Sequence, residues 1–398
     1  MRRLVISSAL IVVFVLCEPP LSFGQQSHES LPRIKHSDIL RRFPLTKFYD
    51  TSVPLPPGNA GELIRSSPFD EYTLSSDVQA VRILYYSESH NGDLVASSGV
   101  VLFPDSKPPT EGWPIIAWAH ELDGVARACA PSLSRNLLHG PFLSMYVSLG
   151  YAVVATDYTG LGTNFPNAFS DVRSNAQDLI YSVEAARKTV PGLGKRWIAM
   201  GTDEGAIAVV GVAELEQQKP DPSYLGAIAI SRLADVEDSP SLMASESRQL
   251  PLELAYGIKT ISPQFDPKDI LSDSALPFYQ RIRSECRVRD AEELSLSQML
   301  KVHWTENRWV QEFFKQNRLG SKPAKGPLLV ISSEGDPVFG LTSQVVMHLC
   351  HQHDIVQFNR YGDSDPGAVI GDSTRDQISW IHDRFAGVTA KSNCPAQP

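Results

Sequence analysis

At the centre of the chain stands the sequence Gly201-Thr202-Asp203-Glu204-Gly205-Ala206. A strand-like run, Lys195 to Met200, precedes it, and a helix-like run, Ala206 to Leu215, follows it. Glycines on both sides of a tight strand-to-helix turn leave room for the backbone, and such a turn projects its central residue from the edge of a sheet. The residue in that position is Asp203, so the turn presents an acid.

Apolar strand-like runs alternate with amphipathic helix-like runs on both sides of this turn. The expected strands are 78–88, 94–104, 113–120, 151–157, 196–201, 225–231, 327–332 and 355–360, and the expected helices are 136–149, 176–189, 206–215, 341–351 and 374–385. The first two strands are joined through Asn91-Gly92, a strong hairpin signal. The alternation predicts an α/β fold with a mostly parallel, doubly wound sheet.

The alternation stops between residues 233 and 325. That stretch is rich in charged and helix-favouring residues and is broken by several prolines. We interpret it as a helical cap, residues 233–325, inserted into a core that comprises residues 25–232 and 326–398.

The first residues carry an export signal. Arg2 and Arg3 precede an apolar run from Leu4 to Cys17, and Ser22-Phe23-Gly24 provides a small-residue cleavage site. We therefore expect a signal peptide at residues 1–24 and a secreted or periplasmic protein with no transmembrane segment. In such a compartment four cysteines can form disulfides in three pairings: Cys129, Cys286, Cys350 and Cys394.

Charge excludes several kinds of partner. The formal net charge is −9 and no basic stripe occurs, which disfavours nucleic acid and anionic membranes. We expect no cofactor and no metal ion, and the sequence sets no oligomeric state.

Several motifs together resemble the secretory lipase family, a group of fungal and bacterial secreted lipases. The resemblance runs from about Phe48 to Gly387. The motifs are Trp113-Pro114-Ile115-Ile116-Ala117-Trp118-Ala119-His120, Gly124-Val125-Ala126-Arg127, Cys129-Ala130-Pro131-Ser132, Asp157-Tyr158-Thr159-Gly160-Leu161-Gly162-Thr163 and Trp380-Ile381-His382-Asp383-Arg384-Phe385-Ala386-Gly387. The resemblance implies an α/β-hydrolase fold with a helical cap. It also implies the disulfides Cys129–Cys286 and Cys350–Cys394.

The catalytic pattern of that family is not kept. Its nucleophile turn reads G-x-S-Q-G, where this chain has Asp203 and Glu204 at the serine and glutamine positions. The family's acid matches Asp336, in Glu334-Gly335-Asp336, but Pro366 stands at the histidine position. Without a hydroxyl there is no serine nucleophile, and without an imidazole there is no general base.

The loop that should stabilise an oxyanion is also altered. The family has H-G-T-T-G, and here Glu121 follows His120. We expect Glu121, Asp123, Asp203 and Glu204 to crowd carboxylates where negative charge develops in ester hydrolysis. One like charge at about 4 Å opposes an oxyanion by roughly 4 kcal/mol at an effective dielectric constant of about 20. His120 is expected to orient the loop.

Two alternatives to an inactive site are open for these acids: a nucleophile and a cation site. Asp203 could attack substrate itself, as aspartate nucleophiles do in epoxide hydrolases, but no histidine follows the last strand where the base belongs. The carboxylates, with Asp336, could hold a cation, although no known ligand spacing links them. We interpret the chain as an inactive lipase relative, a pseudoenzyme that binds a lipid or another hydrophobic ligand. The alternative is an active triacylglycerol lipase or carboxylesterase of lipid catabolism that uses a non-standard nucleophile, such as Asp203.

Overall fold

The computed structural model describes residues 42–395, apart from residues 122, 236, 238–248 and 363. The expected signal peptide, residues 1–24, lies outside the described residues. Among the helices of the described segments, none combines the length and the apolar character needed to cross a membrane.

One mixed sheet forms the centre of the molecule. Across the described residues its strands follow the order β1-β2-β3-β5-β4-β6-β7-β8-β9. The strands are β1 (Leu63–Pro68), β2 (Val78–Glu88), β3 (Leu94–Pro104), β4 (Trp113–Ala119), β5 (Ala152–Thr156), β6 (Leu193–Thr202), β7 (Tyr224–Ile230), β8 (Leu328–Ser333) and β9 (Val356–Tyr361). The first four in this order pair antiparallel, and every pairing from β5 to β9 is parallel. The predicted mostly parallel α/β sheet is confirmed.

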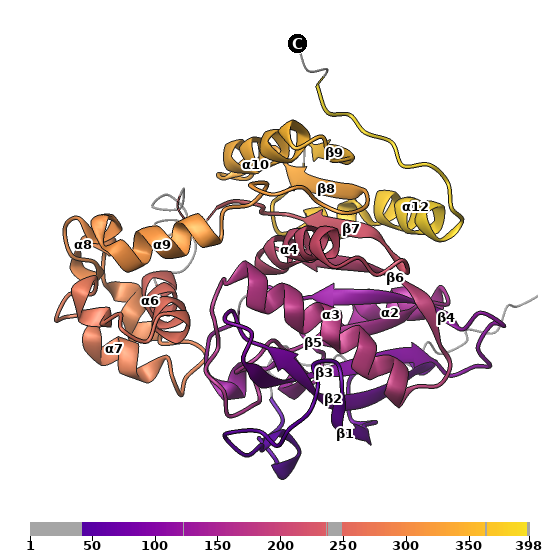
Figure 1. Ribbon diagram of the computed structural model, residues 1–398, viewed down its shortest axis with the longest axis horizontal. Coiled ribbons are helices and arrows are strands. Elements are labelled where there is room, and N and C mark those ends of the chain that lie inside the picture. Colours follow the sequence, from indigo (N-terminus) through magenta and orange to yellow (C-terminus); the bar gives the residue numbers. More distant parts are fainter. Residues whose placement is uncertain (1–41, 122, 236, 238–248, 363, 396–398) are drawn as a thin grey trace, which may run out of the picture.

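Helices pack on the sheet and form a second lobe beside it (Figure 1). The helices are α2 (Gly140–Ser148), α3 (Val172–Thr189), α4 (Glu204–Gln218), α6 (Leu250–Ile261), α7 (Leu276–Arg281), α8 (Leu296–Met299), α9 (Arg308–Gln316), α10 (Phe339–His351), α11 (Val369–Asp372) and α12 (Thr374–Phe385). Short 3-10 helices lie at Lys47–Tyr49, Arg127–Cys129, Pro131–Leu133, Pro267–Asp269, Arg289–Glu293 and Trp304–Glu306. Helices α3 and α4 lie side by side against the sheet. Helices α6 to α9 make up the second lobe, which we call the helical lobe, and the sheet with its own helices is the sheet lobe.

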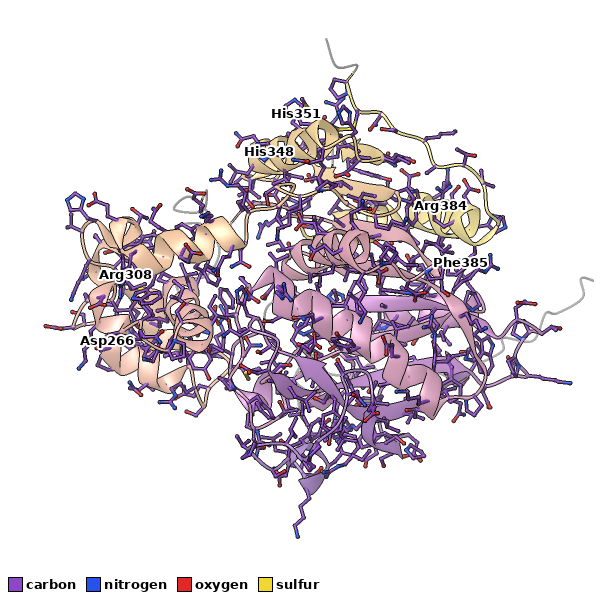
Figure 2. The ribbon with its side chains drawn as sticks, viewed as in Figure 1. Asp266, Arg308, His348, His351, Arg384 and Phe385 are labelled. Atoms are coloured by element: carbon purple, nitrogen blue, oxygen red, sulfur yellow. A yellow bond between two sulfur atoms is a disulfide. The ribbon has the colours of Figure 1, made fainter. Side chains whose placement is uncertain are left out.

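Each lobe has a hydrophobic core of its own. The sheet and its helices enclose one large apolar cluster. Helices α6, α7 and α9 enclose another, into which Val125 and Phe169 reach from loops of the sheet lobe. Side chains fill both lobes in Figure 2, where Asp266 and Arg308 lie in the second lobe and Arg384 and Phe385 end α12. The predicted division at residues 233 and 325 stays a prediction.

Three elements differ from expectation for identifiable reasons. The helix expected from residue 136 begins at Gly140, because Leu137 and Leu138 have left-handed φ values of 52° and 63°. The helix expected from residue 176 begins at Val172, because the Asp171 carboxylate caps it by accepting from the Ser174 amide at 2.8 Å. Strand β1 was not predicted, and its side chains are partly or fully exposed, so it lacks the apolar alternation of a core strand.

Candidate functional site

The turn between β6 and α4 has the geometry that its sequence predicts. Asp203 adopts φ 51° and ψ −112° and stands at the N-cap of α4. Its amide still donates to the Ile230 carbonyl of β7, at 3.2 Å. The strained residue is therefore held between two central strands and the start of a helix, at the carboxyl edge of the sheet.

Glycine is required on both sides of Asp203. A Cβ atom at Gly201 would lie 2.4 Å from the Gly205 carbonyl oxygen, and one at Gly205 would lie 2.1 Å from the Ala119 carbonyl oxygen. Real Cβ atoms do not approach backbone atoms so closely. The two glycines thus let α4 begin directly against β4.

The carboxyl group of Asp203 is enclosed and faces charges of both signs. Burial raises the pKa of Asp203, the nearby Arg232 guanidinium lowers it, and the Glu121 carboxylate raises it further, with a net upward shift. The Thr202 hydroxyl donates to Asp203 Oδ2 at 3.3 Å. The position of the nucleophile in a hydrolase turn is thus occupied by a carboxyl group with a raised pKa.

Arg232 is paired with the acid of the expected triad. It lies just after β7, separated from it by Ser231, and its Nε donates to Asp336 Oδ2 at 3.0 Å. Asp336 lies after β8, its side chain is 1% exposed, and its Oδ1 accepts from the Val338 amide at 2.9 Å. In a serine triad this carboxylate would orient a histidine. Here an arginine takes that place and links Asp336 electrostatically to Asp203.

Pro366 is half-buried in a turn after β9 whose neighbouring residues, 365, 367 and 368, are exposed. The Ser333 hydroxyl at the end of β8 donates to the Ser364 carbonyl, which holds this turn beside the loop that carries Asp336. The loop in which the resemblance places the catalytic histidine therefore lies beside the Asp336 loop, as expected, but it carries Pro366 at that position. The four histidines after Asp336 are exposed, and Figure 2 shows His348 and His351 on α10.

Both ring nitrogens of His120 lie against backbone carbonyl groups. One ring nitrogen faces the Glu121 carbonyl, the other lies 3.2 Å from the Asp157 carbonyl, and the ring packs on Tyr158 with centroids 4.4 Å apart. The side chain is 2% exposed. These contacts support the orienting role that we expect for His120.

Three of the four acids expected to crowd the oxyanion position have partners of their own, and their effect on a developing negative charge stays a prediction. Glu121 Oε2 lies 2.7 Å from His139 Nε2, Asp123 pairs with Arg42, and Glu204 Oε1 accepts from the Ser170 amide at 2.8 Å and from the Asn175 amide group at 3.2 Å. The Glu121 carboxylate still acts on Asp203 electrostatically, although it is paired with His139.

The pKa values of the two glutamates differ because their surroundings differ. Burial raises the pKa of Glu121, but the hydrogen bond and charge of His139 outweigh it, and the net shift is downward. Burial also raises the pKa of Glu204, and there the hydrogen bond from Ser170 does not compensate. Within the described residues no group of acids, histidines and cysteines is arranged to hold a metal ion.

Both implied disulfides are confirmed. Cys129 is bonded to Cys286 with Cα atoms 5.4 Å apart, and Cys350 to Cys394 with Cα atoms 5.6 Å apart. The first joins the loop after β4 to the helical lobe, and the second fixes the C-terminal segment to α10.

Two residues of the site were missed from the sequence. Arg232 lies just after a strand that lies between β6 and β8, and residues after neighbouring parallel strands meet at one edge of the sheet. That rule could have placed Arg232 beside Asp203 and Asp336. His139 gave no such signal, because it lies in an irregular loop before α2.

Solved structures share this fold, although their sequences are distant. Candida antarctica lipase A in its closed state is 16% identical with a TM-score of 0.74, over 90% of this chain and 91% of that one. The rice cell wall degrading esterase LipA from Xanthomonas oryzae is 15% identical with a TM-score of 0.68, over 82% and 98%. A putative hydrolase from Legionella pneumophila is 16% identical with a TM-score of 0.68, over 81% and 98%.

These likenesses show a lipase-like α/β-hydrolase fold. No protein-family model and no curated protein matches the sequence. Membership of the secretory lipase family in particular stays a prediction.

Proposed function

We propose that this protein is an exported, lipase-derived protein that does not hydrolyse esters through a serine triad. The observation that carries the proposal is the Arg232–Asp336 pair at 3.0 Å beside Asp203 at the tip of the turn. An arginine stays protonated at physiological pH, so it cannot accept the proton that a nucleophile must lose. Two disulfides support an oxidising compartment.

We further propose that the protein binds a lipid or another hydrophobic ligand where the two lobes meet. Val125 and Phe169, from loops of the sheet lobe, pack into the apolar cluster of the helical lobe. Apolar surface thus meets at the junction of the lobes, which is a common place for small-molecule sites.

The test is turnover of p-nitrophenyl esters of several chain lengths by the purified mature protein. The natural protein and Asp203→Ser are both expected to be inactive, because the substitution supplies a hydroxyl but no base. A double variant, Asp203→Ser with Pro366→His, tests whether a serine hydroxyl together with a histidine base restores ester hydrolysis. Fluorescence of a bound polyene fatty acid, such as cis-parinaric acid, tests ligand binding in all three proteins.

A second candidate is an ester hydrolase that uses Asp203 as its nucleophile. The turn geometry favours it, because φ 51° is the strained conformation in which such turns display a nucleophile. Attack of the Asp203 carboxylate on the acyl carbon would form an acyl–aspartyl anhydride and release the alcohol. Hydrolysis of this anhydride by water needs a base, and His120 is bound to backbone carbonyls while His139 is paired with Glu121. Turnover that incorporates ¹⁸O from labelled water into Asp203, and that Asp203→Asn abolishes, would establish this candidate and refute the first.

A further inference from the structure

A cavity of 300 Å³ lies away from the turn that carries Asp203. It is enclosed by the β2–β3 connection, the loop after β5, the start of α3 and the end of α6. This volume is at the lower end of the range for small-molecule pockets, about 300–1,000 Å³. Asn175 connects the cavity to that turn, because it lines the cavity and its amide group donates to Glu204.

One wall of the cavity carries a histidine with a fixed orientation. His90 Nδ1 lies 2.8 Å from Asp171 Oδ2, and Asp171 is itself 0% exposed. Asp171 Oδ1 accepts from both the amide and the hydroxyl of Ser174, so the carboxylate cannot rotate freely. In the neutral imidazole Nδ1 then donates to Asp171, and Nε2 is left as the acceptor. Among the described residues none forms a hydrogen bond with Nε2.

The charges around the cavity have one sign. Glu88, Asp93 and Asp178 line it, and the described lining includes neither lysine nor arginine. The remaining wall is largely apolar and includes Leu94, Phe165 and Ile261. An acceptor backed by a buried carboxylate, in a negative and partly apolar cavity, favours a cationic donor attached to a small apolar group.

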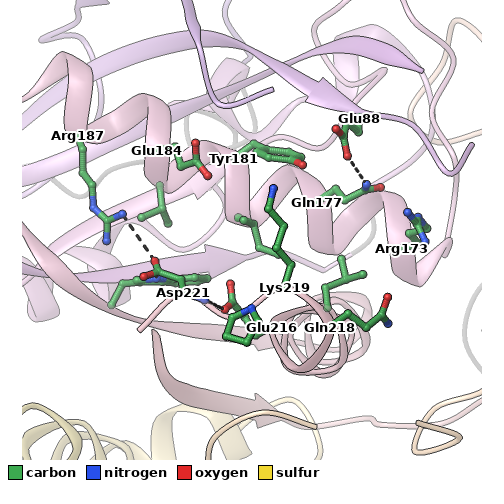
Figure 3. Close-up of a pocket in the computed structure, with 15 residues that line it drawn as sticks. Glu88, Arg173, Gln177, Tyr181, Glu184, Arg187, Glu216, Gln218, Lys219 and Asp221 are labelled. Carbon is green, nitrogen blue, oxygen red and sulfur yellow. Dashed lines mark hydrogen bonds and ion pairs between the residues drawn. The ribbon is translucent and has the colours of Figure 1, made fainter. Parts of the chain in front are cut away.

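The neighbouring hollow between α3 and the end of α4 makes a useful contrast (Figure 3). It also contains acids, but Arg173, Arg187 and Lys219 lie among them. Arg187 Nη1 lies 3.9 Å from Asp221, and Gln177 donates to Glu88 at 2.9 Å. Three cationic side chains thus lie among the acids of this hollow, whereas the described lining of the cavity at His90 has none.

We propose that the cavity at His90 is a second small-molecule site that binds a primary amine carried on a small apolar body. The ammonium group donates to His90 Nε2 and lies in the field of Asp178 and Glu88. The apolar body packs against Phe165 and Ile261. The site is independent of whether the turn at Asp203 hydrolyses esters.

The experiment is calorimetric titration of the full mature protein, with both disulfides intact, using benzylamine as the probe. Benzyl alcohol and benzoate have nearly the same shape and differ in charge. We expect benzylamine to bind about tenfold more tightly than benzyl alcohol, because a charge-assisted hydrogen bond is about twice as strong as a neutral one. We expect no binding of benzoate.

Variants locate the binding. His90→Gln should weaken benzylamine binding about tenfold, since it removes the oriented acceptor. Glu184→Gln, in the hollow of Figure 3, and His382→Gln, on the surface of α12, should leave it unchanged. If His90→Gln does not fold, the ¹⁵N shift of His90 Nε2 in the natural protein gives the same answer, because bound benzylamine must perturb it.

Three outcomes would overturn the proposal. The first is no detectable binding of benzylamine. The second is binding of benzyl alcohol or benzoate as tight as that of benzylamine. The third is benzylamine binding that His90→Gln does not weaken and that leaves the ¹⁵N shift of His90 Nε2 unchanged. Each is independent of the ester assays, so failure of this site is distinguishable from failure of the proposed function.

Discussion

At the scale of single residues, Arg232 determines the electrostatics of the candidate site. It neutralises Asp336, which is almost fully buried, and it opposes the upward pKa shift of Asp203. A serine triad needs a group that gains and loses a proton in this place, whereas a guanidinium holds its charge. With the serine and histidine positions also changed, a fixed ion pair stands where a triad would need a group that titrates.

Replacing Arg232 with methionine should reduce the free energy of unfolding by about 2 kcal/mol. Breaking a fully buried pair costs about 3–5 kcal/mol, and the effect here is smaller because the Arg232 side chain is 28% exposed. Urea unfolding at pH 7 measures the change. Adding Asp336→Asn to the variant should recover most of the loss, because the unpaired buried charge is then gone. An Arg232→Met protein as stable as the natural one would contradict this account.

At the scale of elements, the contact between β4 and the start of α4 depends on Gly205. Gly205→Ala should destabilise the protein by about 3 kcal/mol or more, because its Cβ would meet the Ala119 backbone at 2.1 Å and backbone cannot move aside cheaply. Gly340→Ala in α10 is the matched control. Nothing lies within 4 Å of a Cβ there, so alanine should stabilise by about 0.5–1 kcal/mol. Thermal and urea unfolding distinguish the two, and equal effects would refute the steric argument.

The two disulfides close loops of different length, which sets their relative contributions. Cys129 and Cys286 are 157 residues apart, and Cys350 and Cys394 are 44 apart. Loop-closure entropy predicts that Cys129→Ser with Cys286→Ser costs about 5 kcal/mol, about 1 kcal/mol more than Cys350→Ser with Cys394→Ser. Guanidinium unfolding of the two double variants measures the difference. Limited proteolysis should cut the helical lobe only in the first variant, because only that bond joins the lobes.

At the scale of the whole molecule, the fold was predictable and the charge pairing was not. The alternation of apolar strands with helices predicts strands β3 to β9 and their mostly parallel pairing, because parallel strands need crossover connections. It does not place β5 between β3 and β4. Strand β1 has no such pattern, and only its pairing with β2 makes it a strand. The positions of Asp203, Asp336 and Pro366 follow from motifs. The partners of Glu121 and Glu204 come from distant loops, where His139, Ser170 and Asn175 give no local signal.

The stability of the whole protein should fall as the pH rises from 5 to 8. Burial raises the pKa of Glu214, Glu216 and Glu253 to about 7 and that of Asp178 to about 6. Unfolded carboxyls have a pKa near 4, so in this range the native state binds more protons than the unfolded state. The stabilisation is complete below the unfolded pKa and is lost as the pH passes through the folded values.

Each such carboxyl contributes a slope of up to about 1.4 kcal/mol per pH unit between its two pKa values. Urea unfolding at pH 5, 6, 7 and 8 measures the sum. Glu253→Gln supplies the internal control. The Glu253 side chain is almost fully buried, no described residue forms a hydrogen bond with Oε2, and Gln249 can still donate to the remaining oxygen. Glutamine removes the ionisation and keeps the shape, so the variant should gain stability at pH 8, change little at pH 5 and flatten the curve between them. A stability that rises with pH, or a Glu253→Gln variant with the natural slope, would show that these buried acids ionise without cost to the fold.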